Sequence, residues 1–95
     1  MVLGDLLARF GDESAAAEAV LSLGDLRLVA ALRTRAEAEG LGLGAFASLA
    51  VRRYEAKASD EEWVTLIGEL ARSADPGLAF IKRALVHAVD APSRA

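Results

Sequence analysis

Residues 59–71 read SDEEWVTLIGELA, and this stretch decides the fold class because its apolar side chains follow a helical repeat. They recur with the i, i+3, i+4, i+7, i+8 spacing of a helix that buries one face. These residues are Trp63, Leu66, Ile67, Leu70 and Ala71. Ser59 and Glu62 fit the capping box S-x-x-E, in which the serine oxygen accepts from the Glu62 N–H and the glutamate reaches back to the Ser59 N–H. The stretch therefore predicts an amphipathic helix that starts after Ser59.

The three adjacent acids Asp60, Glu61 and Glu62 also invite interpretation as a metal site or an acid–base pair. A hard cation needs several oxygens that converge on one point, whereas successive helical side chains point in different directions around the axis. Negative charge in the first turn is, in contrast, favoured by the helix dipole. We therefore interpret the three acids as a helix start and predict no metal site.

Glycine, proline and capping residues divide the rest of the chain into short helices. One or two helical turns are predicted over residues 2–10, and helices over 13–23, 26–39, 45–58 and 76–91, in addition to the one that follows Ser59. Asp12, Asp25 and Asp75 are predicted N-caps, and Pro76 suits a first helical position, where its missing N–H costs nothing. Gly68 costs about 0.5–1 kcal/mol inside its helix relative to alanine, so it predicts a close crossing with another backbone.

Composition supports an all-α fold for the whole chain. Of its residues 54% are hydrophobic, yet only three are Phe, one is Trp and one is Tyr. Alanine and leucine favour helices, whereas strands are richer in aromatic and β-branched residues. A chain of 95 residues is expected to form one domain. We predict a single domain over residues 1–92, built as a small bundle of four or five short helices, with a disordered tail at 93–95.

Charge and residue types argue against several functions. The net charge of −3 disfavours nucleic acid as a partner, because such binding depends on the neutralisation of phosphates. The absence of cysteine excludes disulfides, thiolate metal sites and a cysteine nucleophile. The apolar N-terminal stretch is broken by Gly4 and Asp5, and no window approaches the roughly 18 apolar residues of a membrane span. We expect a cytoplasmic chain with no membrane segment.

His87, the only histidine, is the main candidate for catalysis, since imidazole is the usual acid–base group near neutral pH. A triad also needs a nucleophile and an orienting group, and no serine lies in a nucleophile-elbow context. The glycines of GLGLG (residues 40–44) do not match a phosphate-binding fingerprint, because no strand precedes them and no lysine follows. We interpret His87 as a partly buried packing residue and predict no catalytic or cofactor-binding residues and no enzyme activity.

Two segments resemble known kinds of protein. Residues 19–55, AVLSLGDLRLVAALRTRAEAEGLGLGAFASLAVRRYE, resemble the core of a ribbon-helix-helix repressor, in which a short strand precedes two helices joined by a glycine turn. The resemblance implies a strand near residues 18–23, an intertwined dimer and base contacts in the major groove of DNA. Residues 58–85 are similar to short bacterial helical proteins of unassigned activity, which implies a helical unit without catalytic residues.

Abundant apolar side chains and few convergent polar groups predict a non-catalytic protein-interaction module, acting as an adaptor or regulator. The expected partner is another protein or a second copy of the chain, which would make a homodimer. Interfaces favour aromatic anchors, and basic residues cluster nearby. The predicted partner-binding residues are Phe46, Tyr54, Trp63, Arg52 and Arg53. Three alternatives stay open: the three aromatic side chains are plain core, the chain is a ribbon-helix-helix DNA-binding regulator or antitoxin, or it is an enzyme, which would need a pocket in which His87 meets a carboxylate.

Overall fold

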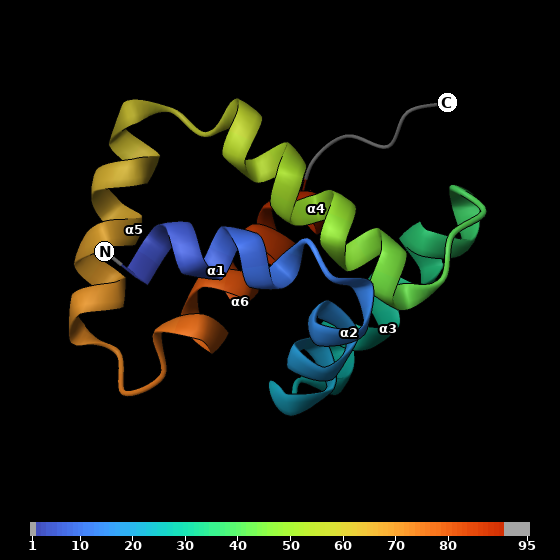
Figure 1. Ribbon diagram of the computed structural model, residues 1–95. Coiled ribbons are helices and arrows are strands. Elements are labelled where there is room, and N and C mark those ends of the chain that lie inside the picture. Colours follow the sequence, from blue (N-terminus) through green and yellow to red (C-terminus); the bar gives the residue numbers. More distant parts are fainter. Residues whose placement is uncertain (1, 91–95) are drawn as a thin grey trace.

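Six helices make up the part of the chain that the computed structural model describes, residues 2–90 (Figure 1). They are α1 (Val2–Phe10), α2 (Glu13–Ser22), α3 (Leu26–Ala38), α4 (Leu43–Lys57), α5 (Asp60–Arg72) and α6 (Pro76–Asp90). No strand occurs between residues 2 and 90. The all-α prediction is confirmed, but the predicted number of four or five helices is wrong, because α1 is a full helix and not an isolated turn. The predicted tail, residues 93–95, lies outside the described residues.

The helix ends follow local side-chain chemistry. Side-chain oxygens of Asp12, Asp25, Ser59 and Asp75 each accept a hydrogen bond from a backbone N–H two or three residues further on, at 2.8, 3.0, 3.1 and 3.2 Å. These bonds satisfy N–H groups that have no partner within the helix, and they confirm all four predicted caps. Gly24 and Gly40 follow α2 and α3 with φ of 67° and 70°, the left-handed conformation that glycine adopts most easily.

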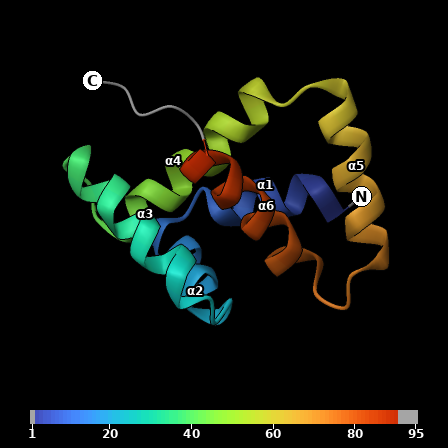
Figure 2. The same cartoon turned by 180° about the vertical axis from the view of Figure 1, so that it is seen from behind.

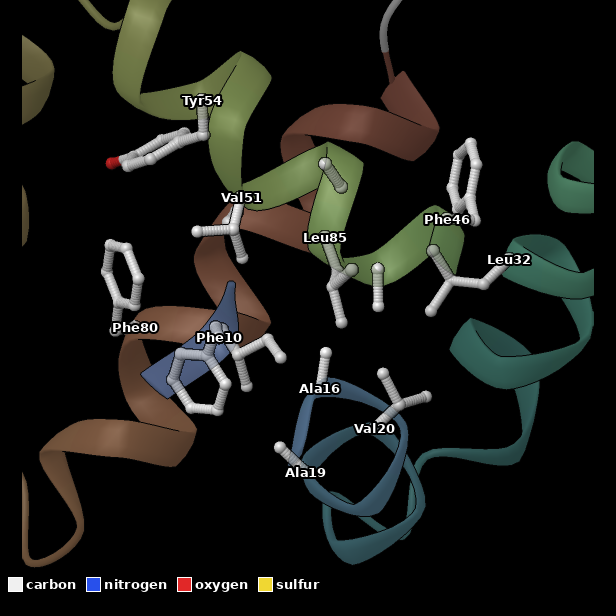
Figure 3. Packing of buried hydrophobic residues seen from close by; sticks show 14 of the residues in the cluster. Phe10, Ala16, Ala19, Val20, Leu32, Phe46, Val51, Tyr54, Phe80 and Leu85 are labelled. Atoms are coloured by element: carbon white, nitrogen blue, oxygen red, sulfur yellow. The ribbon is translucent and has the colours of Figure 1, made fainter. Parts of the chain in front are cut away.

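The core lies along α4 and α6, which cross the middle of the molecule. The shorter helices surround them: α2 and α3 lie at one end of the molecule and α5 at the other (Figures 1 and 2). Fully buried Phe10 and Phe80 stack with their ring centroids 6.1 Å apart. Figure 3 shows these rings near Tyr54, while Phe46 and Leu32 lie together at the opposite end of the cluster.

α2 and α4 cross closely at Gly44. A Cβ atom built on Gly44 would lie 2.5 Å from the backbone oxygen of Glu13, so only glycine permits this approach. The prediction of a close backbone crossing at Gly68 is wrong, because the nearest neighbour of a Cβ there would be the Arg72 side chain at 3.4 Å. A glycine within a helix thus marks a close approach only where another element lies against it.

The strand that the ribbon-helix-helix resemblance implies over residues 18–23 does not form: residues 18–22 are the last turns of α2, and Leu23 is its C-cap. The preceding alanines favour a helix, and Ala16, Ala19 and Val20 are all buried on one side of it. A strand would alternate its side chains between two faces and could not bury these three together. Helical packing therefore decides the conformation of this stretch.

The helices of residues 2–90 reach at most 15 residues. A membrane-spanning helix needs about 20 consecutive apolar residues. None of the described helices is long and apolar enough to cross a bilayer.

Candidate functional site

Glu62, in the first turn of α5, is the centre of a polar cluster that joins three helices. Its carboxylate accepts hydrogen bonds from the Tyr54 hydroxyl of α4 and from the Arg83 guanidinium of α6, whose Nη2 lies 2.9 Å from Oε1. His87 Nε2 lies 3.3 Å from the same Oε1 atom. Arg83 Nη1 also donates to Glu69 Oε1 at 2.7 Å. The cluster therefore fastens α5 to the rest of the bundle through charged hydrogen bonds.

The pKa values of Glu62 and Tyr54, whose side chains are hydrogen-bonded to each other, are both shifted away from neutral pH. Hydrogen bonding from Arg83 lowers the pKa of Glu62 to about 2, so its carboxylate stays ionised. Burial and the neighbouring Glu62 carboxylate raise the pKa of Tyr54 well above its usual value, so its hydroxyl stays protonated. General acid–base catalysis is most effective when the pKa lies near the working pH. The pair is therefore suited to holding the fold together.

The capping-box prediction is half confirmed. Ser59 Oγ accepts from the Glu62 N–H at 3.1 Å, as the motif requires. The Glu62 side chain does not fill its predicted role, because it turns toward Tyr54 and Arg83 instead of the Ser59 N–H. A guanidinium is a stronger partner for a carboxylate than a neutral backbone N–H is.

The sequence analysis did not predict that Glu62 and Arg83 would join α5 to α6. The available signal was spacing: Glu62 and Glu69 lie seven residues apart, and Arg83 and His87 four apart, so each pair shares one helix face. An acidic face on one helix and a basic face on the next suggest a contact. Nothing in the sequence, however, indicates that α5 and α6 bring these faces together.

A pocket of about 500 Å³ opens beside the cluster, between α3, α4, α6 and the start of α5. Its apolar wall consists of Phe46 and five alanines, Ala38, Ala50, Ala58, Ala84 and Ala88. Because an alanine side chain ends at Cβ, these positions leave space that larger side chains would fill. Its polar wall consists of Arg35, Glu39, Arg53, Tyr54, Lys57, Ser59, Glu62 and His87. The volume lies within the range of about 300–1,000 Å³ typical of ligand sites.

The rim of the pocket is charged and exposed. Arg53 donates from both Nη atoms to the Glu39 carboxylate, at 3.0 and 3.2 Å, and this ion pair lowers the pKa of Glu39. Arg35 donates to the backbone oxygen of Val89. Lys57 is exposed and has no ion-pair partner within residues 2–90. The rim therefore offers an uncompensated ammonium group.

The structure brings three of the five predicted partner-binding residues to this pocket: Phe46, Tyr54 and Arg53. Phe46 and Tyr54 are only 2% and 5% exposed, which agrees with the alternative that they are core residues. Trp63 is partly buried behind Tyr54, with ring centroids 5.7 Å apart. Arg52 is exposed and is not part of the pocket wall.

His87 packs edge-on against the Tyr54 ring, with centroids 5.2 Å apart, and its side chain is 50% exposed at the pocket. Within residues 2–90 no group of three or more acidic or histidine side chains is placed to hold a metal ion. Comparisons with protein-family models, curated proteins and solved structures find no match. The geometry of the pocket is therefore the basis for assigning a function.

Proposed function

We propose that the chain is a non-catalytic binding module that holds a segment of another protein in the pocket between α3, α4, α5 and α6. The observation that carries this proposal is an open pocket of about 500 Å³ with an apolar wall and a charged rim. Such a combination is typical of binding sites, where apolar contact supplies affinity and a few polar groups fix orientation.

The protonation and hydrogen bonding of the polar groups at the pocket favour binding over catalysis. The low pKa of Glu62, set by its hydrogen bonds with Arg83, makes it a weak base at neutral pH. Ser59 also borders the pocket, but its oxygen is engaged by the first turn of α5. Nucleophilic catalysis needs a nucleophile next to a base that can accept its proton. His87 is the remaining candidate base, and it does meet a carboxylate, that of Glu62; among residues 2–90, however, its polar contact is with this carboxylate and not with the Ser59 hydroxyl.

Exposure of the rim favours a macromolecular partner. The side chains of Arg53 and His87 are 46% and 50% exposed, so the pocket is open on this side. An occupant would keep part of its surface in water, as one segment of a larger molecule does. A second copy of the chain is the alternative source of such a segment.

Filling the pocket tests this proposal. Ala88 is only partly buried, so Ala88→Leu should occupy the hollow without disrupting the core. The control is Ala30→Leu, on an exposed position of α3 outside the pocket. Affinity capture from the native cell should recover a partner with the wild type and with Ala30→Leu but not with Ala88→Leu. Recovery of the same proteins by all three would reject the proposal.

Molar mass, measured by light scattering on the same samples, separates the two sources of the segment. A mass of two chains that returns to one chain in Ala88→Leu would assign the pocket to a second copy. A mass of one chain in all three proteins, together with pocket-dependent capture, would support a different protein as partner.

A further inference from the structure

Positive and negative side chains around the pocket do not balance each other. Glu39 is engaged by Arg53, and Glu62 is engaged by Arg83, which approaches from outside the pocket wall. Each of these two acids thus has a guanidinium partner, although Arg83 is shared with Glu69, and the wall carries three cations, Arg35, Arg53 and Lys57, against the two acids. Lys57 remains without an ion-pair partner within residues 2–90. The pocket is thus locally basic in a chain of net charge −3.

This inequality points to an anionic group on the occupant, since an uncompensated cation on the rim attracts negative charge. The rest of the wall, Phe46 and the alanines, is suited to an apolar group. An occupant that contacts both the charged rim and the apolar wall needs one negative charge next to an apolar side chain.

A carboxylate fits this rim better than a phosphate does. The first turn of α5, which begins beside the pocket at Ser59, carries the exposed acids Asp60 and Glu61. Negative side chains at a helix start repel a second anion there, and a dianion is repelled more strongly than a monoanion. One ammonium group, that of Lys57, matches the single charge of a carboxylate.

We propose that the pocket recognises an acidic peptide segment, in which one Asp or Glu carboxylate meets Lys57 while a neighbouring apolar side chain lies against the alanine wall. This inference rests on the proposed function and names the chemistry of the partner. The partner's segment binds with its carboxylate at the rim and its apolar side chain inside.

His87 provides a specific reporter for this test, because it is the only histidine and it lies at the pocket. Its imidazole proton signals can be followed by NMR while a blocked peptide, acetyl-Ala-Leu-Glu-Leu-Ala-amide, is added. The matched probe carries Gln in place of Glu. We expect the Glu peptide to shift the His87 signals saturably and the Gln peptide to bind about three- to fivefold more weakly, the size of one exposed charge interaction.

The two lysines of the chain supply a matched pair of variants. Lys57→Gln should remove the preference for the Glu peptide, so that both peptides bind alike. Lys82→Gln, an exposed lysine of α6 outside this pocket, should leave the preference unchanged. Neither lysine contributes to the buried core, so circular dichroism should show the same fold for both variants.

Each other outcome overturns the inference in an identifiable way. Equal affinity of the wild type for the two peptides would overturn the acidic chemistry and leave the proposed function standing. A response to octanoate but to neither peptide would assign the pocket to small carboxylic acids. Shifts that persist in Ala88→Leu would place the peptide outside the pocket, and no response at all would overturn the inference. The proposed function is judged separately, by pocket-dependent capture of a partner.

Discussion

The two ends of the bundle are held together by different means. At the crossing of α2 and α4, the backbones nearly touch at Gly44, and buried Ala16, Ala19 and Val20 pack without polar contacts between the helices. At the other end, α5 buries only Leu66 completely and is fastened by the hydrogen bonds of Glu62. The first contact depends on shape and the second on charge. Changes of pH and of charge should therefore act on the α5 end, while changes of side-chain volume should act on the centre and the α2–α4 crossing.

The largest loss of stability is expected in the apolar centre. Phe80 is fully buried and packs on Phe10 and Tyr54, with centroid distances of 6.1 Å to each. Phe80→Ala should lower the free energy of unfolding by about 3–5 kcal/mol, because it removes apolar contact and leaves a cavity. Urea denaturation followed by circular dichroism measures this change. A loss below about 1 kcal/mol would show that the centre is not tightly packed.

The pH dependence of stability should be the clearest property of the α5 end. The pKa of Glu62 lies at about 2 in the folded chain and near 4.5 when it is unfolded. A lowered folded pKa stabilises the protein above pH 4.5, and that stabilisation is lost as the pH falls toward 2. We expect a contribution on the order of 3 kcal/mol from this group.

Glu62→Gln isolates this contribution. The variant should show a shallower fall in unfolding free energy between pH 5 and pH 2 than the wild type. Glu61→Gln, at the exposed neighbouring position, should follow the wild-type curve. Parallel curves for the wild type and Glu62→Gln would mean that charge does not hold α5.

A smaller effect is expected where the backbones touch. Gly44→Ala places a methyl carbon 2.5 Å from the Glu13 backbone oxygen, too close for a real contact, so α2 and α4 must move apart. Overpacking of this kind costs about 1–3 kcal/mol. Gly68→Ala should instead be neutral or stabilising, because alanine is the better helix former and the nearest contact there is the end of the Arg72 side chain. Thermal unfolding of the two variants gives the comparison, and equal losses would contradict it.

The smallest effect is expected at the exposed ion pair of the rim. Glu39 and Arg53 are 37% and 46% exposed, compared with 13% and 23% for Glu62 and Arg83. Arg53→Gln should cost no more than about 1 kcal/mol, because water screens the interaction. Denaturation at low and high salt measures this cost, which should shrink further with added salt. If Arg53→Gln cost more stability than Glu62→Gln, the Glu39–Arg53 pair would contribute more than the Glu62–Arg83 pair, contrary to this expectation.

Much of the fold could be predicted because it follows from neighbours along the chain. Asp12, Asp25, Ser59 and Asp75 cap helices in the structure as they were expected to, since a cap bonds to an N–H only two or three residues away. The helical content likewise reflects local preferences of alanine and leucine. The number of helices was underestimated, because a nine-residue α1 is stable only when it packs on the others.

The starts of the helices and their apolar faces follow from the order of the residues alone, since these properties depend on neighbours within about one or two turns. Three features arise only when the helices pack: Gly44 and not Gly68 lies at a crossing, Glu62 turns to Tyr54 and Arg83, and five alanines from separate segments line one pocket. These outcomes depend on contacts between residues far apart in the chain. Local patterns leave several helix arrangements open, and the close packing of whole helices selects one of them.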